Sequence, residues 1–396
     1  MSAMGWRRSG SWDTIADLPD DAPPDTRGRR GTADFVLFAV MTMVGIPVRG
    51  VPLVEVASAL AVLLAMTRAP RARPALGTTA LLLVAMVGLM FLSAELNDLS
   101  PLRRLLHLVL YAALMVVASQ GRFHQGAMSR GLAFGLVVSG AAYYAGYSPG
   151  YEGRLTGLFG DPNAAGYVLT TLGCLALGGL MTSRFRWPIG LVILALIVLT
   201  FSRTSLLATA LILAWMLIGS RVATLFGSIL LGLMVYAVTS IPTSLQNFGP
   251  FEDRTGSDAL RSRIVAQEKV MIGDSPWYGN GPGTSRVQVQ GDSFFFHNSY
   301  LALQNEGGRL AVALLVGAGI VALVGLMRLP TGSRNFWYEG ALIALAVCAV
   351  NLGEVLLELP AALALGVAVY HARVARQGSA DPPITVPSWH ANRVNL

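Results

Sequence analysis

Four short motifs carry most of the polar side chains that could bind an anion or move a proton in an otherwise apolar chain. They are GRLTGLFGDPNAAGYVL (153–169), LTFSRTSLL (199–207), RSRIVAQEKVMIGDSPWYGNGPGTS (261–285) and FHNSYLALQNEGG (296–308). Ionisable residues beside long apolar segments are costly at membrane depth and are functional candidates by default. The chemistry they suggest is phosphate binding by arginine and general base catalysis by histidine.

Arg203 stands between two apolar segments that are joined almost without a loop, where the hydrocarbon of a membrane would begin. A guanidinium at that depth needs a partner. It could simply reach for lipid headgroups, but its permanent charge and planar fork also match phosphate oxygens. Arg154 precedes a helix that Asp161 could cap and that Asn163 begins. These residues are therefore a second candidate part of an anion site.

The third motif predicts an amphipathic outer helix, because apolar residues recur at helical spacing over 257–273. Arg261 and Arg263 point to different faces of such a helix. We expect one of them to face the site, and a solvated polar face is the alternative for both. The GNGPG turn that follows lacks the Lys-Ser/Thr pair of a phosphate-binding loop.

His297 is the histidine expected nearest the outer face, since His107 is predicted at mid-span and the others on the cytoplasmic side. Imidazole titrates near neutral pH and is the usual general base. Asn298, Tyr300 and Glu306 make the helix start that follows unusually polar. His297 is therefore the candidate base, and its neighbours are candidates for shaping the site.

The sequence contains no cluster of His and Cys, and no paired carboxylates at metal-ligand spacing in one outward loop. We therefore expect no metal and no cofactor. A membrane enzyme that acts on a diphosphate without a metal would have to stabilise the departing charge with arginines. The outward motifs supply several arginines on one face.

The elements that must position these motifs are membrane helices. Apolar residues make up 54% of the chain and charged residues 13%, against about 25% charged in a soluble domain. The apolar blocks of roughly 17–22 residues match one helical crossing of a bilayer. The predicted fold class is all-α, a polytopic integral membrane protein with about twelve transmembrane helices.

The predicted organisation is one membrane domain over 33–375, between disordered cytoplasmic tails at 1–32 and 376–396. A long outward loop at about 241–308 separates the ninth and tenth spans and carries short amphipathic helices. The predicted spans are 33–49, 51–67, 75–93, 102–119, 129–147, 163–182, 187–202, 203–219, 222–240, 309–328, 337–356 and 360–375.

Arginines in the short loops predict the orientation. Ten fall in loops predicted as cytoplasmic and five in outer loops, which is the positive-inside bias. Both termini are therefore predicted in the cytoplasm, and the four motifs outside it. The net charge of +7 is explained by anchoring of loops to the membrane, so nucleic acid is not an expected partner.

Taken together, the four motifs resemble the O-antigen ligase and O-antigen polymerase superfamily of lipid-linked glycan transferases. The first is similar to that family's Arg-Gly-Phe-x-x-x-Asn start of a span, and FSRTSLL to its Ser-Arg-Thr/Gly turn. The third resembles its outer helix with Pro-x-x-Gly-x-Gly-x-Gly, and HNSYLALQNEGG its His-Asn-x-Tyr-Leu…Glu-x-Gly start. The resemblance covers about 150–328, under half of the chain. Val265 departs from it, because the family usually has Trp there.

The resemblance implies a metal-independent, inverting transferase in the bacterial plasma (inner) membrane, in contact with membrane lipids. It would move a glycan from a polyprenyl-diphosphate-linked donor to a saccharide or glycolipid acceptor. Arginines would hold the diphosphate, and a histidine would position or deprotonate the acceptor hydroxyl. The implied catalytic residues are His297, Arg203 and Arg261, and the implied substrate-binding residues are Arg154, Asn163, Asn298, Glu306 and Arg263.

Two other interpretations stay open. A transporter or flippase of an anionic or lipid-linked substrate would also turn basic residues toward a cavity, but it would form no free polyprenyl diphosphate. A peptidoglycan polymerase of the shape-and-division type would instead depend on an acidic residue in the outer loop. Its candidates here are Asp253, Asp258 and Asp274.

Overall fold

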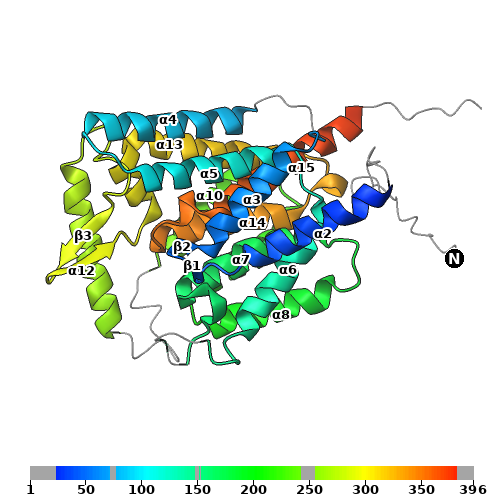
Figure 1. Cartoon of the computed structure of the whole chain (residues 1–396), viewed down its shortest axis with the longest axis horizontal. Helices are drawn as coiled ribbons and strands as arrows, with labels where there is room; N and C mark the ends of the chain where they lie inside the picture. The colour runs from blue at the N-terminus through cyan, green and yellow to red at the C-terminus, as the bar shows by residue number, and fades with distance from the viewer. Residues whose placement is uncertain (1–23, 72–76, 148–150, 152, 242–254, 381–396) are drawn as a thin grey trace, which may run out of the picture.

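The structure is a computed structural model that describes residues 24–71, 77–147, 151, 153–241 and 255–380 (Figure 1). These residues are mostly helical and form thirteen α-helices. The helices are α2 (Pro24–Val40), α3 (Leu53–Met66), α4 (Thr78–Leu96), α5 (Leu102–Ser119), α6 (Gln125–Ala141), α7 (Pro162–Gly179), α8 (Arg186–Leu199), α9 (Arg203–Ile218), α10 (Thr224–Thr239), α12 (Thr255–Gly273), α13 (Ser299–Met327), α14 (Phe336–Asn351) and α15 (Leu359–Ala380).

Three of these helices, α4, α5 and α13, are long and apolar enough to cross a membrane. Six further apolar stretches of helix are shorter, with 10–17 residues. The fold therefore fits an all-α membrane protein, and the number of twelve crossings stays a prediction. One large hydrophobic core runs from Phe38 in α2 to Ala375 in α15, which fits a single membrane domain.

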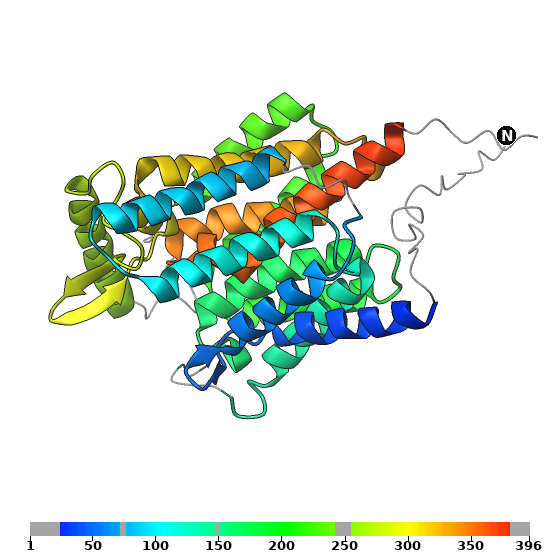
Figure 2. The ribbon, with the colours of Figure 1, turned by 45° about the horizontal axis from the view of Figure 1, so that its top comes forward.

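The two ends of the helical bundle differ. Helix α12 and a small hairpin project from one end, whereas α2 begins and α15 ends at the opposite end (Figures 1 and 2). We call the first the loop end and the second the terminal end. Helix α14 begins at the terminal end, where the Ser333 carbonyl just before it lies 3.0 Å from Nε2 of His371 in α15.

Two short antiparallel hairpins depart from the all-helical prediction. The strands β1 (Pro47–Val48) and β2 (Val51–Pro52) interrupt the predicted first span, and α2 begins within the predicted tail. Proline cannot continue a helix. Arg49 and Gly50 both have positive φ, 50° and 82°, as a two-residue hairpin turn requires. The predicted span 33–49 is therefore wrong at its end, whereas its start lies close to the beginning of the apolar part of α2, Gly31–Val40.

The second hairpin lies in the outer loop, in strands β3 (Arg286–Val289) and β4 (Asp292–Phe295). Val287 and Val289 alternate with exposed residues and join Ile264 of α12 in a small separate core. The amphipathic helix predicted over 257–273 is confirmed as α12, Thr255–Gly273. The outer loop is therefore a helix packed on a hairpin.

Helix α13 is kinked where the glycine-rich turn of the outer loop meets it. Gly308 is non-helical, with φ of 79°, and a side chain there would collide with the Trp277 carbonyl. Gly279 (φ 82°) leaves no room either, because a Cβ would lie 2.7 Å from the Glu306 carbonyl carbon. The kink exposes the Asn305 carbonyl, which accepts a hydrogen bond from the Asn280 N–H at 2.6 Å. The GNGPG run is thus a packing turn that fixes the first part of α13.

Candidate functional site

Arg154 ties together three segments that are distant in sequence. Its Nε donates to the Thr200 carbonyl at 3.0 Å, and a terminal nitrogen donates to the Phe201 carbonyl at 3.4 Å. The same terminal nitrogen donates to Oδ1 of Asn163 at 3.2 Å. The loop before α7, the first turn of α7 and the turn that leads into Arg203 therefore meet at one guanidinium.

The turn between α8 and α9 is as tight as the sequence predicts. Phe201 adopts positive φ, 46°, which lets the chain reverse almost without a loop. Arg203 is the first residue of α9 and is partly buried. The dipole of a helix disfavours a cation at its N-terminus and favours an anion there. A phosphate at this position would gain from both the helix and the guanidinium.

Asp161 caps α7, because its Oδ1 accepts hydrogen bonds from the N–H groups of Asn163 and Ala164 at 2.8 and 2.9 Å. The cap interpretation of this residue is therefore confirmed. Burial and the nearby Asp161 carboxylate raise the pKa of Tyr151. The same carboxylate also acts electrostatically on His297. The start of α7 thus lies near the histidine motif.

His297 lies between β4 and α13, and its backbone N–H donates to Oε1 of the fully buried Glu268 on α12. Burial raises the pKa of Glu268. The pKa of His297 is lowered, first by burial and then by the positive charge of Arg261. The imidazole therefore stays neutral over a wider pH range, as a general base requires. Arg263 is exposed on the same helix, away from this contact.

Asn298 has a local structural role. It is the N-cap of α13, and its Oδ1 accepts from the N–H groups of Tyr300 and Leu301 at 2.9 and 3.1 Å. The Tyr300 hydroxyl donates to the Ala346 carbonyl of α14 at 3.1 Å. The polar helix start thus holds α13 in place, and the amide oxygen of Asn298, a predicted substrate-binding residue, is engaged in capping bonds.

Glu306 is almost fully buried, at 1% exposure, and pairs with an arginine from another helix. Nε of Arg104 lies 3.2 Å from Oε2 of Glu306, and a terminal nitrogen of Arg104 donates to Oε1 at 3.4 Å. A second terminal nitrogen of Arg104 lies 3.2 Å from Glu354. The kink of α13 therefore directs Glu306 toward α5, away from the arginine motifs with which the sequence groups it.

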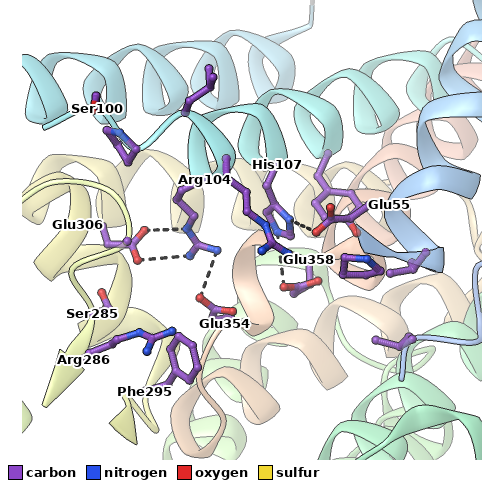
Figure 3. Close-up of a pocket in the computed structure, with 18 residues that line it drawn as sticks. Glu55, Ser100, Arg104, His107, Ser285, Arg286, Phe295, Glu306, Glu354 and Glu358 are labelled. Carbon is purple, nitrogen blue, oxygen red and sulfur yellow. Dashed lines mark hydrogen bonds and ion pairs between the residues drawn. The ribbon is translucent and has the colours of Figure 1, made fainter. Parts of the chain in front are cut away.

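Four glutamates surround this arginine and a histidine in a pocket of about 680 Å³ at the loop end of α5 (Figure 3). Nδ1 of His107 lies 3.1 Å from Glu55, and its Nε2 lies 3.5 Å from Glu358. We call this the carboxylate pocket. Its charged network consists of Glu55, Arg104, His107, Glu306, Glu354 and Glu358, and Tyr111, Arg286 and Phe295 also line it.

The short segment between α14 and α15 carries two of the glutamates and is tied to α13. The Ser299 hydroxyl donates to the Leu352 carbonyl at 2.7 Å and accepts from the Val355 N–H at 2.9 Å. Ser299 follows His297 by two residues. Its hydrogen bonds therefore position both the histidine motif and the segment that carries Glu354 and Glu358. Ser299 is a positioning residue that the sequence does not single out.

A second cavity of about 290 Å³ adjoins the carboxylate pocket and reaches Asp161 and Ala164 of the first motif. Both cavities are lined by Val44, Val54, Glu354 and Glu358. The second cavity continues to Asp161 at the start of α7. The second cavity therefore links the carboxylate pocket to the first turn of α7, with Glu354 and Glu358 bordering both cavities.

Apart from Glu306, the residues of the carboxylate pocket are not predicted as site residues from the sequence. His107 is predicted at mid-span, and the structure places it near the start of α5 against Glu55 and Glu358. A signal exists in the sequence, because Glu55 and His107 are ionisable residues within apolar segments. Glu354 and Glu358 likewise fall at the junction of two predicted spans.

Among the residues that the structure describes, no group of three or more His, Cys, Asp or Glu side chains could hold a metal ion. Of the acidic candidates for the alternative polymerase, Asp274 is exposed after α12. Asp253 and the side chain of Asp258 lie outside the described part of the chain.

Comparison with known proteins gives no relative, since neither a family model nor a curated protein matches the chain.

Proposed function

We propose that this chain is a membrane glycan transferase of the O-antigen ligase and polymerase type. It would transfer a saccharide from a polyprenyl-diphosphate carrier to a saccharide acceptor on the extracytoplasmic face of a bacterial plasma membrane. The observation that supports the proposal is the arrangement of the arginine and histidine motifs at the loop end, where the Asp161 carboxylate of the first motif acts electrostatically on His297 of the fourth. Arg154 bonds Asn163 and the turn before Arg203, while Arg261 lies near enough to His297 to lower its pKa.

In this proposal the donor diphosphate binds at the arginine motifs. A guanidinium matches a phosphate in a bidentate way, and Arg203 adds the N-terminus of α9. Three cations, Arg154, Arg203 and Arg261, would share the charge that gathers on the diphosphate as its bond to the sugar breaks. The prenyl chain would lie against the apolar helices in the lipid.

The proposed reaction is one displacement at the anomeric carbon. Neutral His297 takes the proton from an acceptor hydroxyl, and the hydroxyl oxygen forms a bond to the anomeric carbon. The bond from that carbon to the diphosphate oxygen breaks, and polyprenyl diphosphate leaves with the electron pair. Attack from the side opposite the leaving group inverts the anomeric configuration. The lowered pKa of His297 supports its role as the proton acceptor.

The test is a product assay with the purified full-length chain, a polyprenyl-diphosphate-linked oligosaccharide and EDTA. The proposal expects free polyprenyl diphosphate and a glycan joined to the acceptor, in equal amounts and undiminished by the chelator. A transporter would move the donor between leaflets of a vesicle without forming free polyprenyl diphosphate. That result would contradict the proposal, and so would activity that EDTA abolishes and Mg²⁺ restores.

A further inference from the structure

A groove between helices α7, α8 and α9 contains none of the residues that the proposed reaction uses. It has a volume of about 140 Å³, and α8, which forms one side of it, lies at the edge of the bundle (Figure 1). Leu169 and Leu177 of α7, Leu194 and Ile197 of α8 and Leu213 of α9 are among its lining residues. Its walls are therefore mainly aliphatic.

The two hydroxyl groups that line the groove are bonded within their own helices. Thr170 donates to the Gly166 carbonyl at 2.8 Å, and Thr209 donates to the Ser205 carbonyl at 2.8 Å. Neither hydroxyl needs a partner from a ligand. The groove therefore offers an apolar surface, which an alkyl chain matches because burying both surfaces removes them from water or disordered lipid.

The groove has the length of one membrane leaflet. Its lining on α8 runs from Arg186 to Ile197, which is about 16 Å at the helical rise of 1.5 Å per residue. The hydrocarbon core of a bilayer is ~30 Å thick, so the groove covers about half of it. Leu191, Leu194 and Leu213 line the groove and are exposed, so a chain can enter from the lipid side.

Two arginines stand where the groove meets the terminal end. Arg186 is the first residue of α8 and lines the groove, and the exposed Arg184 precedes it by two residues. The turn before α8 lies at the terminal end, because the Gly178 carbonyl of α7 accepts a hydrogen bond from Asn335, the N-cap of α14. Neither arginine has a carboxylate partner among the described residues.

The charge at the mouth of the groove is therefore not neutralised by the protein that the structure describes. One terminal nitrogen of Arg186 donates to the Met181 carbonyl at 3.1 Å, which leaves most of its five N–H donors for a ligand. Its guanidinium lies 4.7 Å from the ring centre of the exposed Trp187. Tryptophan is enriched at the level of lipid headgroups, so this is the depth at which a lipid phosphate would lie.

We propose that the groove binds one anionic phospholipid, with an acyl chain along α8 and the phosphate on Arg184 and Arg186. A guanidinium matches phosphate oxygens in a bidentate way, and the N-terminus of α8 favours an anion. The proposed donor is not the occupant, because its diphosphate binds at the loop end and the two arginines lie at the terminal end. The lipid site goes beyond the transferase function and does not depend on it.

The test uses the purified, delipidated full chain in detergent and native mass spectrometry. The probes are phosphatidylglycerol and phosphatidylcholine with the same acyl chains, so that only the headgroups differ. We expect the first phosphatidylglycerol to bind about 30-fold more tightly than phosphatidylcholine, as for two arginines near a membrane surface. The double variant Arg184→Gln with Arg186→Gln should remove most of this preference. Arg376→Gln changes an exposed arginine of α15 outside the groove and should leave the preference unchanged.

Gly190→Leu tests the acyl chain separately from the headgroup. Gly190 lines the groove, and a Cβ there would lie 3.6 Å from Leu177, an ordinary contact. The larger side chain should occupy the groove and weaken both lipids about tenfold, as for about two methylene groups that lose their contacts, without changing the preference between them. The melting temperature shows whether this variant folds, and the variants of the two arginines decide the headgroup site in either case.

The proposal is overturned if the two lipids bind equally to the wild type, or if Arg376→Gln loses as much preference as the double variant. It is also overturned if Gly190→Leu folds and binds both lipids as the wild type does. A dimer that forms only without lipid and that Gly190→Leu abolishes would assign the groove to a second copy of the chain, against the proposal.

Discussion

The two ends of the bundle use arginine and glutamate in opposite ways. At the terminal end, Arg334 and Glu339 form a closed pair, with nitrogen–oxygen distances of 2.9 and 2.8 Å. Trp215 donates a further hydrogen bond to Glu339 at 2.7 Å, and Arg334 also donates to the Gly219 carbonyl. At the loop end, one arginine and one histidine serve four glutamates (Figure 3).

The difference separates charge that holds the fold from charge that is available to a ligand. The closed pair is almost fully buried, with 5% and 0% exposure for Arg334 and Glu339, and breaking such a pair costs several kcal/mol. In the open network Glu306 is also buried, whereas the side chains of Glu55, Glu354 and Glu358 are partly exposed. Variants at the terminal end should therefore change stability, and variants at the loop end should change activity.

The largest effect is expected for His297→Ala, which should lower turnover by about 10²–10⁴-fold because general base assistance is lost. The protein should stay folded, since Glu268 contacts only the backbone N–H of residue 297 in the bond described above. Turnover is measured as release of polyprenyl diphosphate, together with the melting temperature.

The matched control is His124→Asn at the terminal end. The His124 ring caps α6 by accepting from the Ala127 N–H, and asparagine is also a good cap. This control should keep its turnover. If His297→Ala retained more than about a third of wild-type turnover, the loss would fall below the range of general base catalysis, and His297 would not be the base.

A smaller effect is expected for the same substitution, arginine to lysine, at the two ends. Arg203→Lys keeps the charge but loses the fork, and should reduce turnover about tenfold, with Arg203→Ala losing about 10²–10³-fold. Arg334→Lys should instead lower the melting temperature, because lysine cannot form both bonds to Glu339. If Arg203→Lys and wild type had equal turnover in matched detergent, the result would favour the alternative in which Arg203 only contacts lipid headgroups.

The smallest effect concerns pH. Because the pKa of His297 is lowered, the neutral base persists below the ordinary imidazole value of about 6.5. Activity should be present above that value and be lost only as the pH falls through the lowered pKa. Arg261→Gln removes a nearby cation and should move the titration upward. An NMR titration of the His297 ring, identified by comparison with His297→Ala, measures this directly. An unchanged midpoint of the His297 titration in Arg261→Gln would contradict the electrostatic effect of Arg261 on His297.

Features that depend on neighbouring residues could be predicted from the sequence. The Asp161 cap, the outer helix α12 and the tight turn before Arg203 follow from local residue types and helical periodicity. The predicted start of the tenth span at 309 coincides with the kink at Gly308, although α13 itself begins at Ser299. The helix continues outward there because Asn298 caps it.

Features that depend on which helices pack together could not be predicted. The carboxylate pocket draws Glu55 from α3, His107 from α5, Glu306 from α13 and Glu358 from the segment just before α15. Each is a single ionisable residue in an apolar setting, and no spacing along the chain links them. The sequence groups Glu306 with His297 because they are close in the chain, whereas the kink gives Glu306 a different partner.

The most direct test of the contrast between the ends is one substitution made at each. Glu339→Gln and Glu358→Gln each neutralise one carboxylate, and both melting temperature and turnover per folded molecule are measured. We predict that Glu339→Gln loses about 3–5 kcal/mol of stability, as for a broken buried pair, while its folded molecules keep wild-type turnover. Glu358→Gln should keep its melting temperature and lose turnover, because Glu358 borders both cavities of the loop end. A Glu358→Gln protein that melts as early as Glu339→Gln and turns over normally would contradict the assignment of the loop end to chemistry.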